Sequence, residues 1–390
     1  MSFLDYRTAG ESHGPVMLAL VEGMPAGVRI DTDLIDHELR RRQGGFGRSA
    51  RQKIEKDQII IKSGVRRGIT IGSPIVLELV NRDHRIDEAP AVTRPRPGHA
   101  DLAGSVKWLT TDCRETLERA SARETAARVA AGALAKCLLK RFGIVVGGFV
   151  RQIGSAKCHV ERTADLAEII HACADNEVYC PDPQAAEAMV QQIKQAAGHG
   201  DTVGGVVEVW VTGVPPGLGS CVRWQDKLDG RLMQAVGSIQ AFKGVEIGAG
   251  FAVAGKFGSD VHDEMDYDPD ERDTPSLGFT RRSNNAGGLE GGMTNGQTVI
   301  VRGVMKPIST LARGLDTVDL ETKEPARSAY ERSDICAVPA ASVVAENVVA
   351  FEFARALLAK FGGDTLDEVR EAYDHYLLAA RALGLDKQAE

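Results

Sequence analysis

The stretch that decides the fold reads SARETAARVAAGALAKCLLKR and covers residues 121–141. Alanine dominates it, Phe142 and Gly143 follow it, and Ser121 and Glu124 have the S-x-x-E spacing of a capping box. These features predict a helix over 121–141. Because small residues occur all round this helix, we expect it to be buried on several sides, between two sheets.

The segments on either side of this helix mix strands and helices without regular alternation. That irregular order predicts an α+β class, a β-α-β sandwich with central helices between antiparallel sheets, and not a doubly wound parallel sheet. No repeat or linker divides the chain, so residues 1–390 are expected to form a single domain. Helices are predicted over 31–43, 183–197, 226–241, 340–361 and 364–383, and strands over 15–18, 58–65, 68–81, 143–151, 203–213, 246–254 and 298–304.

The composition excludes several classes of protein. With 43% hydrophobic and 26% charged residues among 390, the chain has the make-up of an ordinary globular protein. A net charge of −7 argues against a body that binds nucleic acid. Seven cysteines without a C-x-x-C pair fit a reducing compartment and argue against a zinc site, so no metal is expected. The start MSFLDYRTAG is unlike a signal peptide and no apolar run could span a membrane, which predicts a cytoplasmic protein.

Charge is unevenly distributed along the chain. Residues 260–273, DVHDEMDYDPDERD, hold eight acids and one base, and we interpret the segment of about 257–275 as an exposed, mobile loop. Residues 40–53, RRRQGGFGRSARQK, contain no acid. There Arg42 and Arg48 flank glycines, an arrangement that can grip a phosphate or carboxylate; a solvated helix end is the alternative.

The segment RTAGESHGP, residues 7–15, contains the G-x-S-x-G pattern of a hydrolase nucleophile elbow around Ser12. An elbow requires a helix after the serine, but the residues that follow Pro15 are typical of a strand. The pattern therefore disfavours a hydrolase and leaves His13, among glycines that allow a ligand to approach closely, as the candidate residue.

Two further segments present basic residues on constrained backbone. RPRPGHAD, residues 94–101, displays His99 beside Arg96 as a candidate acid or anion contact. RASARET, residues 119–125, lies at the start of the alanine-rich helix, where free N–H groups favour an anion.

The last candidate region lies late in the chain. Glycines in 284–297 suggest backbone wrapped around a ligand, Lys306 and Thr310 can reach an anion, and Asp334 is a candidate base. Taken together, these segments predict an enzyme for a small, multiply anionic, phosphate-bearing substrate, with room for a second ligand.

From about residue 7 to about residue 360 the chain resembles the chorismate synthase family. The motifs that carry the resemblance, in the family's order, are GESHG, RRRQGGFGR, RPGHAD, RASARETAARVAAGALAK, SIQAFKGVEIG, RRSNNAGGLEGGMTNGQ, KPIST and ERSDICAVPAASVVAENVVAF. The resemblance implies a β-α-β sandwich, a homotetramer and a lyase of the shikimate pathway of aromatic amino-acid biosynthesis. This reaction eliminates phosphate from 5-enolpyruvylshikimate 3-phosphate to give chorismate, and it requires reduced FMN (FMNH2) without net redox change.

The resemblance also implies roles for single residues. His13 matches the acid that protonates the departing phosphate, His99 the residue that protonates the flavin at N1, and Asp334 the base that works through flavin N5. The positions implied for substrate anions, or for NADP, are Arg42, Arg48, Arg96 and Arg123. Those implied for the flavin are Arg119, Ala120, Ser121, Gln240 (asparagine in some members), Ala241, Gly291, Lys306, Pro307, Ile308, Ser309, Thr310 and Arg332.

Three alternatives stay open at this point. The reductant of FMN is either NADPH, used by the chain itself, or a separate flavin reductase; the absence of an added reductase domain favours the latter. The chain could instead be a flavin-dependent oxidoreductase acting on a small phosphorylated acid. A phosphate-binding or nucleic-acid-binding module built on residues 40–53 is the third reading, and the net negative charge disfavours it.

Overall fold

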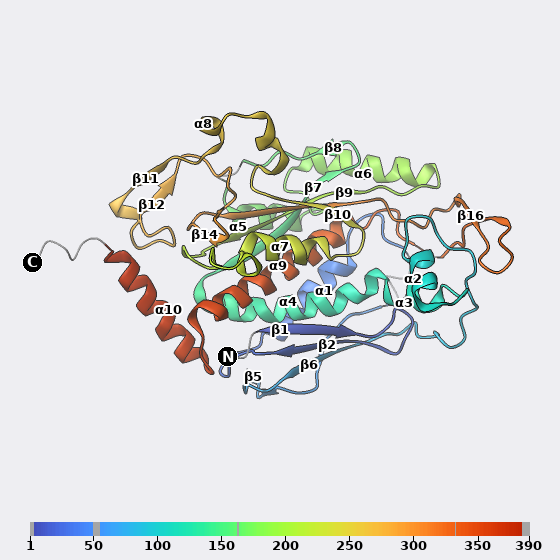
Figure 1. Cartoon of the computed structure of the whole chain (residues 1–390), viewed down its shortest axis with the longest axis horizontal. Helices are drawn as coiled ribbons and strands as arrows, with labels where there is room; N and C mark the ends of the chain where they lie inside the picture. The colour runs from blue at the N-terminus through green and yellow to red at the C-terminus, as the bar shows by residue number, and fades with distance from the viewer. Residues whose placement is uncertain (1–3, 50–54, 162–163, 332, 384–390) are drawn as a thin grey trace, which may run out of the picture.

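The computed structural model describes residues 4–49, 55–161, 164–331 and 333–383 of the chain. Two sheets enclose a layer of helices (Figure 1). The first sheet has the order β1-β2-β6-β3, and these strands span Asp5–Ala9, Val16–Glu22, Ile75–Val80 and Ile60–Ile61. The second has the order β10-β15-β9-β7-β8, and its strands span Phe242–Ile247, Val299–Met305, Gly205–Thr212, Val145–Ile153 and Ala156–Lys157. Every pairing within these two sheets is antiparallel.

The helices form an inner and an outer layer. Inside, α4 packs on β1, β2 and β6, α9 packs on β7 and β9, and α1 contacts both helices. These three helices span Thr125–Leu139 (α4), Val338–Phe361 (α9) and Thr32–Gln43 (α1). Outside lie α5 and α6 over the second sheet and α10 against α9, whereas α7 packs on both α9 and β10. The bounds of α5, α6, α7 and α10 are Leu166–Ala174, Pro183–Gly198, Leu228–Gly237 and Leu366–Arg381. This architecture confirms the predicted α+β class with central helices between antiparallel sheets.

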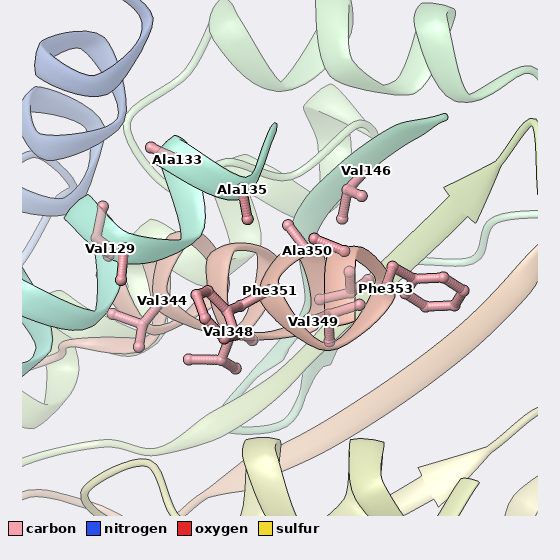
Figure 2. Close-up of a cluster of buried hydrophobic side chains, with 14 of the residues drawn as sticks. Val129, Ala133, Ala135, Val146, Val344, Val348, Val349, Ala350, Phe351 and Phe353 are labelled. Atoms are coloured by element: carbon pink, nitrogen blue, oxygen red, sulfur yellow. The ribbon is translucent and has the colours of Figure 1, made fainter. Parts of the chain in front are cut away.

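The contact between α4 and α9 forms the centre of the molecule. Every residue of α4 except Arg128 and Lys136 is buried. At Gly132 a Cβ atom would lie 2.2 Å from the carbonyl oxygen of Asn347 on α9, so only glycine allows the two backbones to approach this closely. Figure 2 shows valine, alanine and phenylalanine side chains of both helices meeting in this core. The small residues of α4 are therefore required by the close packing of its neighbours.

Strand β7 shows why the second sheet is covered on both faces. A Cβ atom at Gly147 would lie 2.8 Å from Ile170 of α5, and one at Gly148 would lie 2.7 Å from the carbonyl oxygen of Ser342 on α9. Because neighbouring residues of a strand face opposite sides, the two glycines let one helix approach from each side.

A buried polar cluster ties the inner helices together. Lys136 Nζ of α4 lies 2.9 Å from Glu38 Oε2 of α1, and Arg41 Nη2 of α1 lies 2.9 Å from Glu346 Oε2 of α9. Burial acts to raise the pKa of Glu38, but the charges of Lys136 and Arg41 outweigh it and lower that pKa to about 2. The cluster fixes α1 in place. Arg42, which follows Arg41 in this helix, belongs to the candidate site.

The helix predicted over 121–141 is confirmed as α4, but its two ends, Ala122–Glu124 and Lys140–Phe142, are 3-10 turns. Two predictions about local structure are wrong. Ser121 accepts from the N–H of Arg123, and the Glu124 carboxylate binds other side chains, so the expected capping box does not form. The strand expected over 246–254 ends at Ile247, because Gly248 and Gly250 adopt φ values of +59° and +57° and a 3-10 helix, Gly250–Gly255, follows.

The remaining elements are short or lie at the edges. Helix α7 is shorter than the 226–241 helix predicted for it, and two helices between 101 and 119 were not predicted. The bounds of the remaining helices and strands are α2 Asp101–Trp108, α3 Arg114–Arg119, α8 Gly258–Val261, β4 Val65–Arg66, β5 Ile69–Thr70, β11 Met265–Tyr267, β12 Phe279–Arg281, β13 Leu289–Glu290, β14 Met293–Thr294, β16 Asp316–Val318 and β17 Pro325–Arg327. Within the described ranges, none of the helices has the length and apolar character that a membrane span requires.

The acidic segment of about 257–275 is exposed, as expected, but it contains regular structure. It includes α8 and β11, and β11 pairs with β12. Arg282 closes this hairpin through Asp266 and Glu264, with its Nε 2.7 Å from Asp266 Oδ2. Its mobility, like the single-domain organisation, stays a prediction.

Candidate active site

A pocket of about 580 Å³ lies at the end of the sandwich where α4 begins. Seven separate segments line it, so it exists only in the folded chain. They are the β1–β2 loop (Ser12, His13), the end of α1 and the loop after it (Arg42, Arg48, Ser49, Glu55), the loop before α2 (Arg96, Gly98, His99, Ala100), the α3–α4 junction (Leu117, Glu118, Ala120–Arg123), the α7–β10 corner (Gln240–Lys243), the end of β15 and the loop after it (Met305, Lys306, Ile308–Thr310), and residues 331–337 (Glu331, Ser333, Asp334, Ala337).

His13 is held by a carboxylate on α3. Its Nδ1 lies 2.9 and 2.8 Å from the two oxygens of Glu118, and its backbone N–H donates to the same side chain at 3.0 Å. The side chain of Glu118 is fully buried, whereas that of His13 keeps 13% of its surface exposed, on the pocket side. Burial acts to raise the pKa of Glu118, but the hydrogen bonds and charge of His13, with a hydrogen bond from Arg114, lower it below its usual value.

The loop that carries His13 runs directly from strand β1 into strand β2. The amide of Asn81 donates to the carbonyl of Gly14 at 2.7 Å and to that of Glu11 at 3.1 Å, and Ser12 N–H donates to the carbonyl of Glu118. A nucleophile elbow needs a helix after the serine, and here a strand follows. The strand–turn–strand context confirms that Ser12 does not form an elbow.

His99 belongs to a second histidine–carboxylate pair. Its Nδ1 lies in very short contact with Asp101, and the guanidinium of Arg96 donates to both oxygens of Asp101 at 2.8 and 3.0 Å. Arg96 Nη1 also donates to Thr310 Oγ1 at 2.9 Å. Burial acts to raise the pKa of Asp101, but the hydrogen bonds from His99 and Arg96 outweigh it and hold that pKa far below its usual range.

Two buried arginines share one carboxylate beneath the pocket. Arg123 Nη1 lies 2.7 Å from both oxygens of Asp57, and Arg42 Nη1 lies 3.5 Å from Asp57 Oδ2. Arg42 is only 4% exposed, and burial, together with the charge of Arg123, lowers its pKa to about 9 despite Asp57. Glu55 Oε2 lies 3.9 Å from Arg123 Nη2 and adds a more distant carboxylate. An anion in the pocket would stabilise both guanidinium groups further.

Arg48 pairs with Asp334 across the pocket. Arg48 Nη1 lies 2.7 Å from Asp334 Oδ2, and the backbone N–H of Ser49 donates to Asp334 Oδ1 at 2.6 Å. Among the residues that the structure describes, Arg48 Nε and Arg123 Nη2 are buried and have no hydrogen-bond partner. Buried donors of this kind are costly unless a ligand satisfies them.

The wall formed by α7, β10 and β15 supplies polar groups of another kind. Gln240 donates to Glu124 at 2.9 Å, and its buried carbonyl oxygen Oε1 has no hydrogen-bond partner among the described residues. Ala241 has a φ of +69°, a conformation that is uncommon for any residue other than glycine and that occurs at functional sites. Burial and the nearby charge of Lys243 lower the pKa of Lys306 below its usual value.

The structure brings most of the predicted site residues together. Those that line the pocket are His13, Arg42, Arg48, Arg96, His99, Ala120, Ser121, Arg123, Gln240, Ala241, Lys306, Ile308, Ser309, Thr310 and Asp334. Arg119 and Pro307 do not line the pocket. Arg119 is exposed and donates to the Thr8 and Gly10 carbonyls, and Gly291 is at the β13–β14 turn. Arg332 lies outside the described residues.

Sequence reasoning missed the carboxylates that hold these residues. Glu118 directly precedes the motif RASARET, and Asp101 is the last residue of the motif RPRPGHAD. They are the acidic residues nearest to Arg119 and His99 in the sequence and could have been considered. Asp57 had no signal of its own, because its partners Arg42 and Arg123 come from distant segments. Among the residues whose positions are given, no group of three His, Cys, Asp or Glu side chains could hold a metal ion.

Comparisons with known proteins agree on one family. The sequence model described as Chorismate synthase matches residues 4–358. A chorismate synthase of Geobacter sulfurreducens is 53% identical over 97% of this chain and 100% of its own length, and one of Desulforamulus reducens is 52% identical over 94% and 96%. A solved structure described as "Crystal Structure of Chorismate Synthase" superimposes with a TM-score of 0.79 at 41% identity, covering 98% of this chain and 99% of that one.

Proposed function

Because the chain belongs to the chorismate synthase family of lyases, we propose that it removes phosphate and a ring proton from 5-enolpyruvylshikimate 3-phosphate to give chorismate. The reaction uses reduced FMN and leaves the redox state of the reactants unchanged. One observation of geometry carries this proposal: a histidine held by a carboxylate, a second carboxylate and several arginines face the same pocket.

The arginines bind and orient the substrate. A multiply anionic substrate requires several cationic donors at once, and Arg42, Arg48 and Arg123 offer them from the floor and wall of the pocket. Arg48 Nε and Arg123 Nη2, which make no hydrogen bond within the described part of the chain, are donors that such an anion would satisfy. Arg96, whose donors are engaged with Asp101 and Thr310, orients His99 and is less available to the substrate.

His13 and Asp334 carry the proton chemistry on opposite segments. His13 donates a proton at Nε2 to the departing phosphate, since its Nδ1 is engaged with Glu118. Asp334 receives a proton at its carboxylate, which the Ser49 N–H and Arg48 hold in place. An acid and a base on separate walls suit an elimination in which the C–O and C–H bonds that break are far apart.

The residues of the Gln240 wall fit a flavin. The free carbonyl of Gln240, the constrained backbone of Ala241 and the stretch Lys306–Thr310 present acceptors, N–H donors and a cation to one side of the pocket. Reduced flavin, when bound, supplies electron density that helps expel phosphate and takes it back as the proton leaves. His99, which lines the same pocket, would hold a proton close to the flavin.

The further properties that we propose rest on the family. They are a cytoplasmic homotetramer of single-domain chains, whose FMN is reduced either with NADPH by the chain itself or by a separate flavin reductase.

The test is an anaerobic incubation of the purified chain with 5-enolpyruvylshikimate 3-phosphate. We expect phosphate and chorismate when reduced FMN is present, and neither product with oxidised FMN alone. Tight flavin binding without any product would contradict the proposed reaction. The alternative, an oxidoreductase acting on a small phosphorylated acid, predicts instead that a hydride donor is consumed with every turnover.

A further inference from the structure

In the described structure, two carboxylates lie within 4 Å of the ring nitrogens of His13. Glu118, from α3, binds Nδ1 at 2.8–2.9 Å, and Asp83, after β6, lies 3.9 Å from Nε2. Asp83 is 20% exposed and lies 3.3 Å from Arg85, whereas Glu118 is fully buried. Glu118 is therefore the group that fixes the ring.

We propose that Glu118 is a positioning residue, which holds His13 with its Nδ1–H donating to the carboxylate and so leaves Nε2 as the atom that delivers the proton to the departing phosphate. This inference rests on the proposed function of the pocket. It adds to that function a residue that does not touch the reacting groups and acts through His13.

The backbone around His13 leaves the ring few alternatives. Its N–H donates to Glu118 Oε2, and its carbonyl accepts from the N–H groups of Arg85 and Ile86 at 2.9 and 3.1 Å. With the backbone fixed on both sides, the hydrogen bond at Nδ1 decides which nitrogen carries the proton in the neutral ring. The same carboxylate thus fixes both the position and the tautomer of the ring.

Arg114 holds Glu118 in its ionised form. Its Nη1 lies 3.3 Å from Glu118 Oε1, its Nη2 lies 3.1 Å from Glu331 Oε1, and the guanidinium also donates twice to the carbonyl of Pro90. This arrangement agrees with the lowered pKa of Glu118. Glu331 lines the pocket three residues before Asp334, so Arg114 links the support of His13 to the segment that carries the base.

An ionised Glu118 has a chemical consequence for His13. The ionised carboxylate accepts from Nδ1–H, so delivery of a proton by this ring takes place from the imidazolium form through Nε2–H. Because Nδ1–H is engaged, the imidazolium has one N–H, at Nε2, to give to a phosphate oxygen. Without the carboxylate, the ring can present either nitrogen.

The experiment compares the wild-type chain with Glu118→Gln, which keeps the shape of the side chain and removes its charge. The matched control is Glu115→Gln, an exposed position on the same helix. The ring nitrogens of His13 are observed by 15N NMR in histidine-labelled protein and assigned with His13→Gln. Steady-state kinetics with reduced FMN are measured on the same samples.

In the wild-type chain we expect a hydrogen-bonded Nδ1–H on His13, and in Glu118→Gln the loss of that single tautomer, with 15N signals that show protons on both ring nitrogens in exchange. The variant should lose at least about tenfold in kcat with little change in KM, because general acid catalysis contributes on the order of 10²–10⁴ in rate. Glu115→Gln should match the wild type in both measurements.

An Nδ1 without a proton in the wild-type chain, or an unchanged kcat in Glu118→Gln, would overturn the inference. If Glu118→Gln does not fold, the wild-type NMR signal alone decides. If the wild-type chain produces no chorismate, the proposed function fails, while the protonation state of His13 still tests Glu118.

Discussion

Arg48 and Asp334 form an ion pair, 2.7 Å between Nη1 and Oδ2, that joins the loop after α1 to the segment before α9. The backbones of these two segments are also hydrogen-bonded to each other, since the N–H groups of Ile335 and Cys336 both donate to the carbonyl of Gly47. At Gly47, with a φ of +91°, a Cβ atom would lie 3.1 Å from Cys336 Cβ. The proposed base and a proposed anion ligand are therefore positioned as one unit.

Weakening the ion pair between Arg48 and Asp334 should lower substrate binding and turnover together. Arg48→Lys keeps the charge but cannot place two N–H donors in a plane, so kcat/KM should fall about 10–100-fold, the equivalent of one charged hydrogen bond. Steady-state kinetics provide the measurement, and Arg66→Lys, at an exposed position on β4, is the control. A kcat/KM within twofold of the wild type would show that Arg48 does not contact the substrate.

The proposed acid and base should be separable from flavin binding. His13→Ala and Asp334→Ala should each lose at least about 100-fold in turnover, as expected for general acid–base groups, with little change in affinity for FMN. Flavin fluorescence titration measures that affinity, and His37→Ala, exposed on α1, is the control. Loss of FMN binding in either site variant would mean that its role has been misassigned.

The close packing of α4 on α9 predicts a large difference between two glycine-to-alanine substitutions. Gly132→Ala would place a methyl group 2.2 Å from the carbonyl oxygen of Asn347 and should lower the free energy of unfolding by about 1–3 kcal/mol or more. Gly198→Ala, at the end of α6 with no atom within 4 Å of the new Cβ, should raise it by about 0.4–1 kcal/mol. Urea unfolding of both variants decides, and equal effects would contradict the packing described here.

The buried cluster around Glu38 predicts a pH-dependent loss of stability. Because the pKa of Glu38 is lowered from 4.5 to about 2, its contribution is complete above about pH 4.5 and is lost as the pH falls toward 2. Glu38→Gln should therefore be less stable than the wild type by on the order of 3 kcal/mol at pH 7. The difference in the free energy of unfolding between the wild type and Glu38→Gln should become smaller below pH 4.5.

Urea unfolding of both proteins between pH 7 and pH 3 tests this expectation, with the exposed Glu371→Gln as control. A gap that stays constant across that range, or no gap at pH 7, would contradict the assignment to Glu38.

The sequence predicted the layers of the fold better than its irregular parts. The alanine-rich helix and its burial could be predicted because small residues occur on all of its faces. Residues 250–255 resemble a strand in their apolar content, but their side chains are exposed and the flanking glycines turn the backbone into a 3-10 helix. Apolar content within a short segment does not reveal whether a second strand lies beside it.

A similar limit applies to the candidate site. The arginines, lysines and histidines of the site lie in short motifs that can be recognised in the sequence. The resemblance to the chorismate synthase family implies that these motifs form one site. Their partners, such as Asp57 between Arg42 and Arg123, are defined only by contacts between distant segments. Ser121 and Glu124 show the opposite case. They have the spacing of a capping box, but the Glu124 carboxylate accepts hydrogen bonds from Gln240 and Arg128 instead.

The measurement that tests the central claim most directly is the redox balance over many turnovers. The chain is supplied anaerobically with reduced FMN in an amount equal to the enzyme and with 5-enolpyruvylshikimate 3-phosphate in large excess, while phosphate, chorismate and the flavin spectrum are recorded together. We predict equal amounts of phosphate and chorismate, far above the amount of flavin, and flavin that is still reduced at the end. Product limited to the amount of flavin, with oxidised flavin accumulating, would contradict a redox-neutral elimination and identify an oxidoreductase.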